Sequence, residues 1–146
     1  MRRAIAATVL LVGLTAAGCS GKKKPSSLFE TAGKCPPPAS TASAGNAQIS
    51  AQALGGRYAK LIVIRARQKS NGAPIRGGQI TIHAEMTCPH LMQLYDKNLH
   101  ETSPGTYKTR YSLVMPGQWA FYIVLRAKNG DATTSALPVT VKAPGA

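Results

Sequence analysis

The sequence predicts an all-β fold, an immunoglobulin-like antiparallel β-sandwich of about seven strands. Short segments in which apolar and polar residues alternate recur over roughly 100 residues, and turns rich in Gly, Pro and Asn separate them at regular spacing. No segment shows sustained helical periodicity. The 146-residue chain is therefore expected to hold one folded domain, residues 46–146, behind a targeting segment and a linker.

The expected strands can be placed from the alternation. The strand over residues 58–67 holds the continuous apolar run 61–64, which suits a central strand with both faces covered. In the strand over 118–128, Trp119 lies on a face whose alternate neighbours are all apolar, so we expect this side chain to anchor the core. The remaining expected strands cover residues 48–53, 106–115 and 133–142, together with a strand that begins at Gln79.

Residues 1–18 have the pattern of a secretory signal. Arg2 and Arg3 precede an apolar run that ends in small residues directly before Cys19. The run is too short to span a bilayer as a permanent helix. It resembles a bacterial lipoprotein signal, in which the cysteine becomes the lipidated first residue, so Cys19 is predicted to anchor the chain to a membrane. An ordinary cleaved signal with a chance cysteine is the alternative.

The predicted address is the bacterial cell envelope, with the domain facing the periplasm or the exterior. Residues 19–45 are mainly Lys, Ser, Pro, Ala and Gly, a composition that predicts a disordered tether. The three lysines at 22–24 either meet anionic headgroups or form a solvated charge run that keeps the tether extended.

The chain is strongly basic, with a formal charge of +13. Basic charge raises nucleic acid as a partner, but an exported, lipidated protein rarely meets it, and no helix-turn-helix or aromatic-basic ladder is present. The predicted partners are the membrane, through the lipid anchor, and a membrane protein, with no nucleic acid.

The strand that begins at Gln79 carries the candidate chemistry. Its apolar face continues at even positions as Met86, Cys88, His90 and Met92. Thioether, thiolate and imidazole are donors that the soft ion Cu⁺ prefers. Alternate side chains of an extended strand lie about 6.5–7 Å apart, so a loop after the strand has to gather the donors. The predicted copper(I) ligands are Cys88, His90 and Met92, with Met86 as support.

Two further side chains could complete that ligand set. Met115 and His100 are the candidates, and the break that forms the loop is expected at Pro89. Zinc is a poorer match, because one Cys with one or two His falls short of the usual closed zinc set.

Each donor also has a purely structural interpretation. Met86 is suited to filling the core, and His90 to a solvated loop. In an oxidising compartment Cys88 is a candidate for a disulfide with Cys35, which would pin the tether to the domain. The acids of the domain are scattered, and no nucleophile elbow or phosphate-binding loop is present, so an enzyme is not expected.

Three motifs resemble a known pair of families. Residues 71–80 (Asn-Gly-Ala-Pro-Ile-Arg-Gly-Gly-Gln-Ile), 103–107 (Ser-Pro-Gly-Thr-Tyr) and 115–119 (Met-Pro-Gly-Gln-Trp) resemble those of FixH-like and YtkA-like domains. The resemblance covers roughly residues 55–125 and implies a small extracytoplasmic β-sandwich. Some members are linked to respiratory oxidase assembly or to copper handling, and a Met-containing loop often follows the second motif strand, where residues 86–92 fall. The Cys-Pro-His inside that loop departs from the family pattern.

The sequence therefore predicts a membrane-anchored, non-enzymatic accessory module that binds or handles copper(I). The alternative is a structural adaptor without metal that docks on a membrane complex, for example in oxidase assembly or transport.

Overall fold

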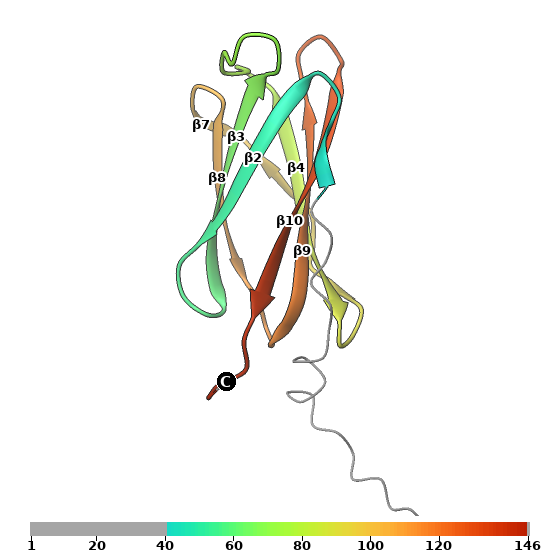
Figure 1. Cartoon of the computed structure of the whole chain (residues 1–146). Coiled ribbons are helices and arrows are strands. Elements are labelled where there is room, and N and C mark those ends of the chain that lie inside the picture. Colours follow the sequence, from blue (N-terminus) through green and yellow to red (C-terminus); the bar gives the residue numbers. More distant parts are fainter. Residues whose placement is uncertain (1–40, 146) are drawn as a thin grey trace, which may run out of the picture.

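Two antiparallel sheets face each other across one apolar core in the computed structural model, which describes residues 41–145 (Figure 1). One sheet has the order β1-β10-β9-β4-β5, with β6 also paired to β4, and the other has the order β2-β3-β8-β7. The strands are β1 (Thr41–Ala44), β2 (Ala47–Leu54), β3 (Ala59–Gln68), β4 (Gln79–Cys88), β5 (Met92–Gln93), β6 (Lys97–Leu99), β7 (Glu101–Ser103), β8 (Thr106–Ser112), β9 (Gly117–Arg126) and β10 (Ala132–Val141).

The predicted all-β, immunoglobulin-like sandwich is confirmed. Alternation places one face of each main strand in the core, because successive side chains of a strand point to opposite faces. Trp119 and the apolar residues at every second position after it on β9 are at most 1% exposed. On β4 the even positions from Ile80 to Met86 are fully buried against them. The central position predicted for β3 is also confirmed, since β3 lies between β2 and β8.

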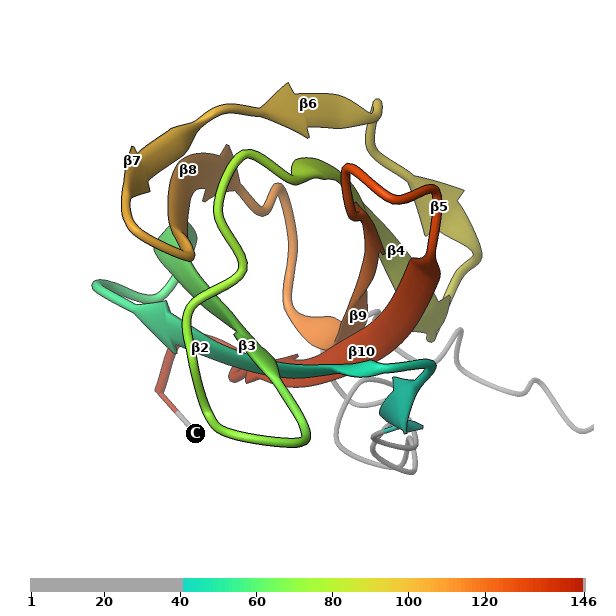
Figure 2. The same cartoon turned by 90° about the horizontal axis from the view of Figure 1, so that it is seen from above.

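Four short strands were not expected from the sequence. β1 lies inside the segment 19–45 that was predicted as tether, and it pairs with β10. β5, β6 and β7 lie in the connection between β4 and β8, where β6 and β7 close one side of the sandwich (Figure 2). Strands of two to four residues show too few alternations to be distinguished from a loop.

Two tyrosines of β8 connect the sheets. Tyr107 Oη donates to the Gly78 carbonyl oxygen, which precedes β4, at 2.9 Å, and Tyr111 Oη donates to the Ile82 carbonyl oxygen at 2.8 Å. Burial raises the pKa of Tyr107, and it raises the pKa of Tyr111 to about 12. Each hydroxyl therefore stays protonated and bridges the two sheets.

The two ends of the sandwich differ in composition. At the end that we call the polar end, turns 69–78 and 127–131 meet the turn between β7 and β8. At the opposite end, the thioether end, the turn 55–58 meets the loop 89–91 and the turn 113–116 (Figure 1). Within residues 41–145 there is no helix long and apolar enough to cross a membrane.

Candidate functional site

The thioether end is built around Met86. This side chain is fully buried near the end of β4, where it is paired with Met92 of β5 on one side and with Trp119 of β9 on the other. Directly opposed residues of antiparallel strands have Cβ atoms about 4.5–5.5 Å apart. The β4 thioether therefore lies between a second thioether and the only indole of the chain.

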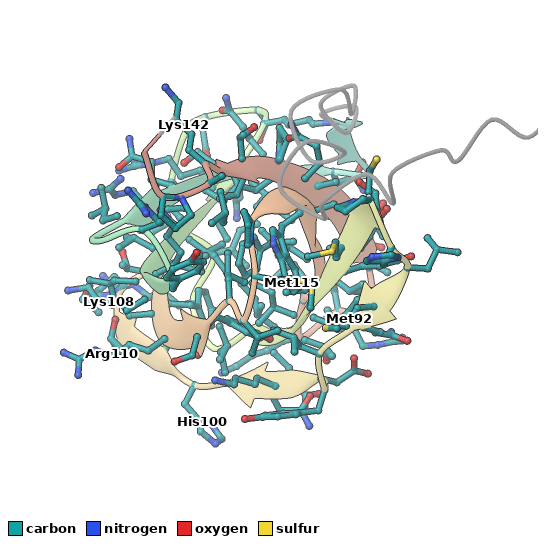
Figure 3. The ribbon with its side chains drawn as sticks, turned by 90° about the horizontal axis from the view of Figure 1, so that it is seen from below. Met92, His100, Lys108, Arg110, Met115 and Lys142 are labelled. Atoms are coloured by element: carbon teal, nitrogen blue, oxygen red, sulfur yellow. The ribbon has the colours of Figure 1, made fainter. Side chains whose placement is uncertain are left out.

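Met115 approaches the same place from the turn that precedes β9. Its carbonyl oxygen accepts a hydrogen bond from Trp119 Nε1 at 3.2 Å. Met115 and Met92 are each partly buried and pack against the core cluster, and both lie at this end of the molecule in Figure 3. Three methionines, Met86, Met92 and Met115, thus lie at the end of the sandwich that holds Trp119.

Gly117 allows the β4 and β9 backbones to approach closely at this end. Its φ of +150° lies in the region that favours glycine, and a Cβ atom added there would lie 2.5 Å from the Cys88 carbonyl oxygen. The same atom would lie 3.4 Å from Met86 Cε. The turn into β9, the end of β4 and the Met86 methyl group are therefore packed in direct contact.

The predicted row of donors is not continuous after Met86. The register between β4 and β9 shifts between Met86 and Cys88, so the alternation that the sequence suggested for residues 86–92 is wrong beyond this point. β4 ends at Cys88 as expected, the loop contains Pro89, and exposed His90 lies in it away from the core face. Met92 returns to the edge of the core only because β5 folds back on β4.

Cys88 is disulfide-bonded. Its predicted partner Cys35 lies outside the described residues, as does Cys19. A metal binds the thiolate form of cysteine, and a sulfur in a disulfide has no thiolate to offer. In this state Cys88 serves as a cross-link, and the soft donors that remain at this end are the thioethers and His90.

The other histidines lie elsewhere. His100 is exposed and directed away from the labelled methionines (Figure 3). His83 is on the outer face of β4, with Nδ1 3.5 Å from Asp96 Oδ1 and its ring centroid 5.1 Å from that of Tyr122. Among the described residues no group of three or more His, Cys, Asp or Glu could hold a metal ion.

Sequence reasoning underestimated Met115 and Trp119 as parts of the candidate site. The number of methionines in the chain would have indicated this site. The chain has four methionines, of which Met1 opens the predicted signal, and the other three all lie at the thioether end. Methionine is flexible and is often core filling, but nothing in core packing requires every copy to be at one end.

No protein-family model and no curated protein matches the chain. Several solved structures are similar to this chain at low sequence identity. The soluble domain of PmoD from Methylocystis sp. ATCC 49242 (Rockwell) is 9% identical over 64% of this chain and 90% of that one, with a TM-score of 0.47. A hypothetical protein from Pyrococcus horikoshii OT3 is 5% identical over 64% and 85%, with a TM-score of 0.41. The PKD domain of the human VPS10 domain-containing receptor SorCS2 is 12% identical over 98% of both chains, with a TM-score of 0.36.

Proposed function

We propose that this chain is a non-enzymatic extracytoplasmic module, anchored to a membrane through Cys19, that binds Cu⁺ through the thioethers of Met86, Met92 and Met115. The observation that carries the proposal is the gathering of every methionine after the signal around Trp119 at one end of the sandwich. The cargo would be held until a membrane protein partner receives it.

The donor chemistry supports Cu⁺ rather than a harder ion. Thioethers are soft ligands, whereas Zn²⁺ prefers thiolate, imidazole and carboxylate groups. Thioethers also bind without losing a proton. Their affinity for Cu⁺ therefore does not fall as the pH is lowered, whereas that of cysteine or histidine does. Partial burial of Met92 and Met115 leaves an entry from solvent, while Met86 forms the floor.

Copper(I) binding can be measured with the full chain carrying Cys19→Ser, which removes the lipid attachment. The protein would be titrated anaerobically with Cu⁺ in ascorbate and followed by native mass spectrometry and by the fluorescence of Trp119. We expect one copper per chain and quenching of the indole emission. Met86→Leu, Met92→Leu and Met115→Leu together should abolish both signals, because leucine keeps the volume and removes the sulfur.

The matched control is Leu125→Ile, a volume-conserving change at a buried residue of β9 near the polar end. It should bind copper as the parent does. Affinity should stay level from about pH 7.5 to about pH 5, a range in which histidine ligands become protonated. Retention of copper by the triple methionine variant, or its loss in Cys88→Ser alone, would refute the thioether site.

A metal-free adaptor is the second candidate, favoured by two exposed apolar side chains at the same end. Leu91 is 82% exposed and Val114 is 60% exposed. If docking on a membrane complex is the function, Leu91→Ser with Val114→Ser should impair growth of the host at any copper level. Under the copper proposal the triple methionine variant impairs growth only when copper is scarce or in excess, and the serine variant leaves copper binding intact.

A further inference from the structure

A shallow pocket of about 380 Å³ opens at the thioether end, between the β2–β3 turn and the end of β10. Three cations line it, namely Arg57, Lys60 and Lys142, together with Thr140 and the backbone of Gly55 and Gly56. Figure 3 shows Lys142 at the rim of this end, directed outward. The pocket is separate from the thioethers, which lie between β4, β5 and β9.

The pocket is positively charged without compensation. No acidic side chain lines it, and no ion pair within residues 41–145 involves Arg57, Lys60 or Lys142. Across those residues the chain has twelve Lys and Arg against four Asp and Glu. The Thr140 hydroxyl already donates to Gln118 Oε1 at 2.7 Å, so the donors that remain for a phosphate group are the guanidinium and ammonium groups, which suit it.

Exposed apolar side chains lie at the same end of the sandwich as the cations. Leu54, 47% exposed, directly precedes the glycines of the pocket, while Val114 and Leu91 project from the two neighbouring turns. The turns adjoin one another: Leu113 N donates to the Tyr58 carbonyl oxygen at 2.8 Å, and Gly117 lies against Cys88 and Pro89. Cations beside apolar tips match the boundary between lipid headgroups and acyl chains.

We propose that the thioether end docks on an anionic phospholipid membrane, with a headgroup phosphate in the pocket of Arg57, Lys60 and Lys142 and with Leu54, Leu91 and Val114 inserted at the interface. This inference does not depend on copper binding. It orients the domain on the membrane, with the thioethers toward the lipid surface.

The chain outside the structure favours a membrane as the occupant. The predicted lipid anchor at Cys19 precedes Thr41 by only 22 residues. A random-coil chain of that length has an r.m.s. end-to-end distance of about 25 Å. An anchored domain would therefore experience a high effective concentration of headgroups, so that even weak docking would be populated.

The test uses the full chain with Cys19→Ser, so that acyl chains cannot mask the contribution of the domain. Sedimentation with phosphatidylglycerol–phosphatidylcholine vesicles should show binding that pure phosphatidylcholine vesicles lack, and the affinity should fall between about 50 mM and about 0.5 M salt. Arg57→Gln, Lys60→Gln and Lys142→Gln together should weaken binding about tenfold or more.

The matched control removes the same charge from another surface. Arg65, Arg67 and Lys108 are exposed on the outer face of β3 and β8, and their triple change to Gln should weaken vesicle binding less than about threefold. If the two triple variants lost equal vesicle affinity, the binding would be diffuse electrostatic attraction, and the pocket would be refuted as a site. Circular dichroism checks folding, and the exposed Lys142→Gln alone repeats the test if the triple variant unfolds.

Two further measurements distinguish a lipid headgroup from free phosphate as the ligand. Leu54→Ser, Leu91→Ser and Val114→Ser together should weaken vesicle binding while leaving weak inorganic phosphate binding unchanged. Unchanged vesicle binding in this variant would refute docking on lipid. The lipid assignment would also fail if inorganic phosphate or a soluble polyanion bound as tightly as the vesicles.

Discussion

The two ends of this sandwich are held together by different chemistry. At the polar end, Glu101 accepts hydrogen bonds from Gly77 N, at 2.9 Å, and from Gly105 N, and thereby joins two turns. A second acid, Asp131, accepts from the side-chain amides of Asn46 and Asn129 at 3.1 and 3.0 Å. Directional hydrogen bonds to these two carboxylates fix the turns at this end.

At the thioether end no comparable acid-to-turn bond is present among the described contacts, and the packing consists of Met86, Trp119 and the close approach at Gly117. Methionine has three rotatable bonds and a polarisable sulfur, so a cluster of methionines can rearrange around a ligand. The polar end therefore fixes its turns by directional hydrogen bonds, whereas the thioether end is held by close apolar packing.

Replacing Trp119 tests whether the thioether end also stabilises the fold, and it should give the largest effect. The side chain is fully buried among β4 and β9 residues, so Trp119→Ala should lower the free energy of unfolding by about 3–5 kcal/mol. Urea denaturation followed by circular dichroism measures this change. A loss below about 1 kcal/mol would mean that the end is loosely packed and contributes little to stability.

Glu101→Gln tests the polar end through its pH dependence. Hydrogen bonds from Gly77 and Gly105 hold the pKa of this carboxyl below its ordinary value of 4.5. Because the folded-state pKa is depressed, its contribution to stability is present above the unfolded pKa and is lost as the pH falls through the folded pKa. Thermal unfolding of the parent should therefore weaken in acid more steeply than that of the glutamine variant, which is less stable at neutral pH. Parallel profiles would show that Glu101 does not fix these turns.

The sequence was sufficient to predict the sandwich because its main strands alternate cleanly. The positions of Ile82, Trp119 and Phe121 in the core follow directly from period-two patterning. The short strands β5 and β6 depend instead on pairing with the edge of β4, which is a tertiary contact that no local pattern encodes.

The candidate site was only partly predictable for the same reason. Met86 was placed correctly on the core face, but the register shift before Cys88 arises where β4 meets Gly117 of β9, far along the chain. Met115 reaches the site through its carbonyl contact with Trp119, a consequence of the turn that precedes β9. A spacing argument within residues 86–92 could find neither.

The smallest expected effect comes from the tyrosine bridges, one nearer each end. Tyr107→Phe and Tyr111→Phe should each cost about 1 kcal/mol, because each leaves a β4-side carbonyl without its donor. The Tyr111 bridge should also make stability depend on pH in alkaline solution, because the folded-state pKa of Tyr111 is raised to about 12. The stabilisation is complete below the pKa of an unfolded tyrosine and is lost as the pH rises through the folded-state pKa. Ultraviolet titration of tyrosinate should show a last-titrating group that disappears in Tyr111→Phe, while Tyr107, whose pKa is also raised, titrates before it. Its persistence in that variant would assign the late group to Tyr107, and the polar end would then hold the more strongly protected bridge.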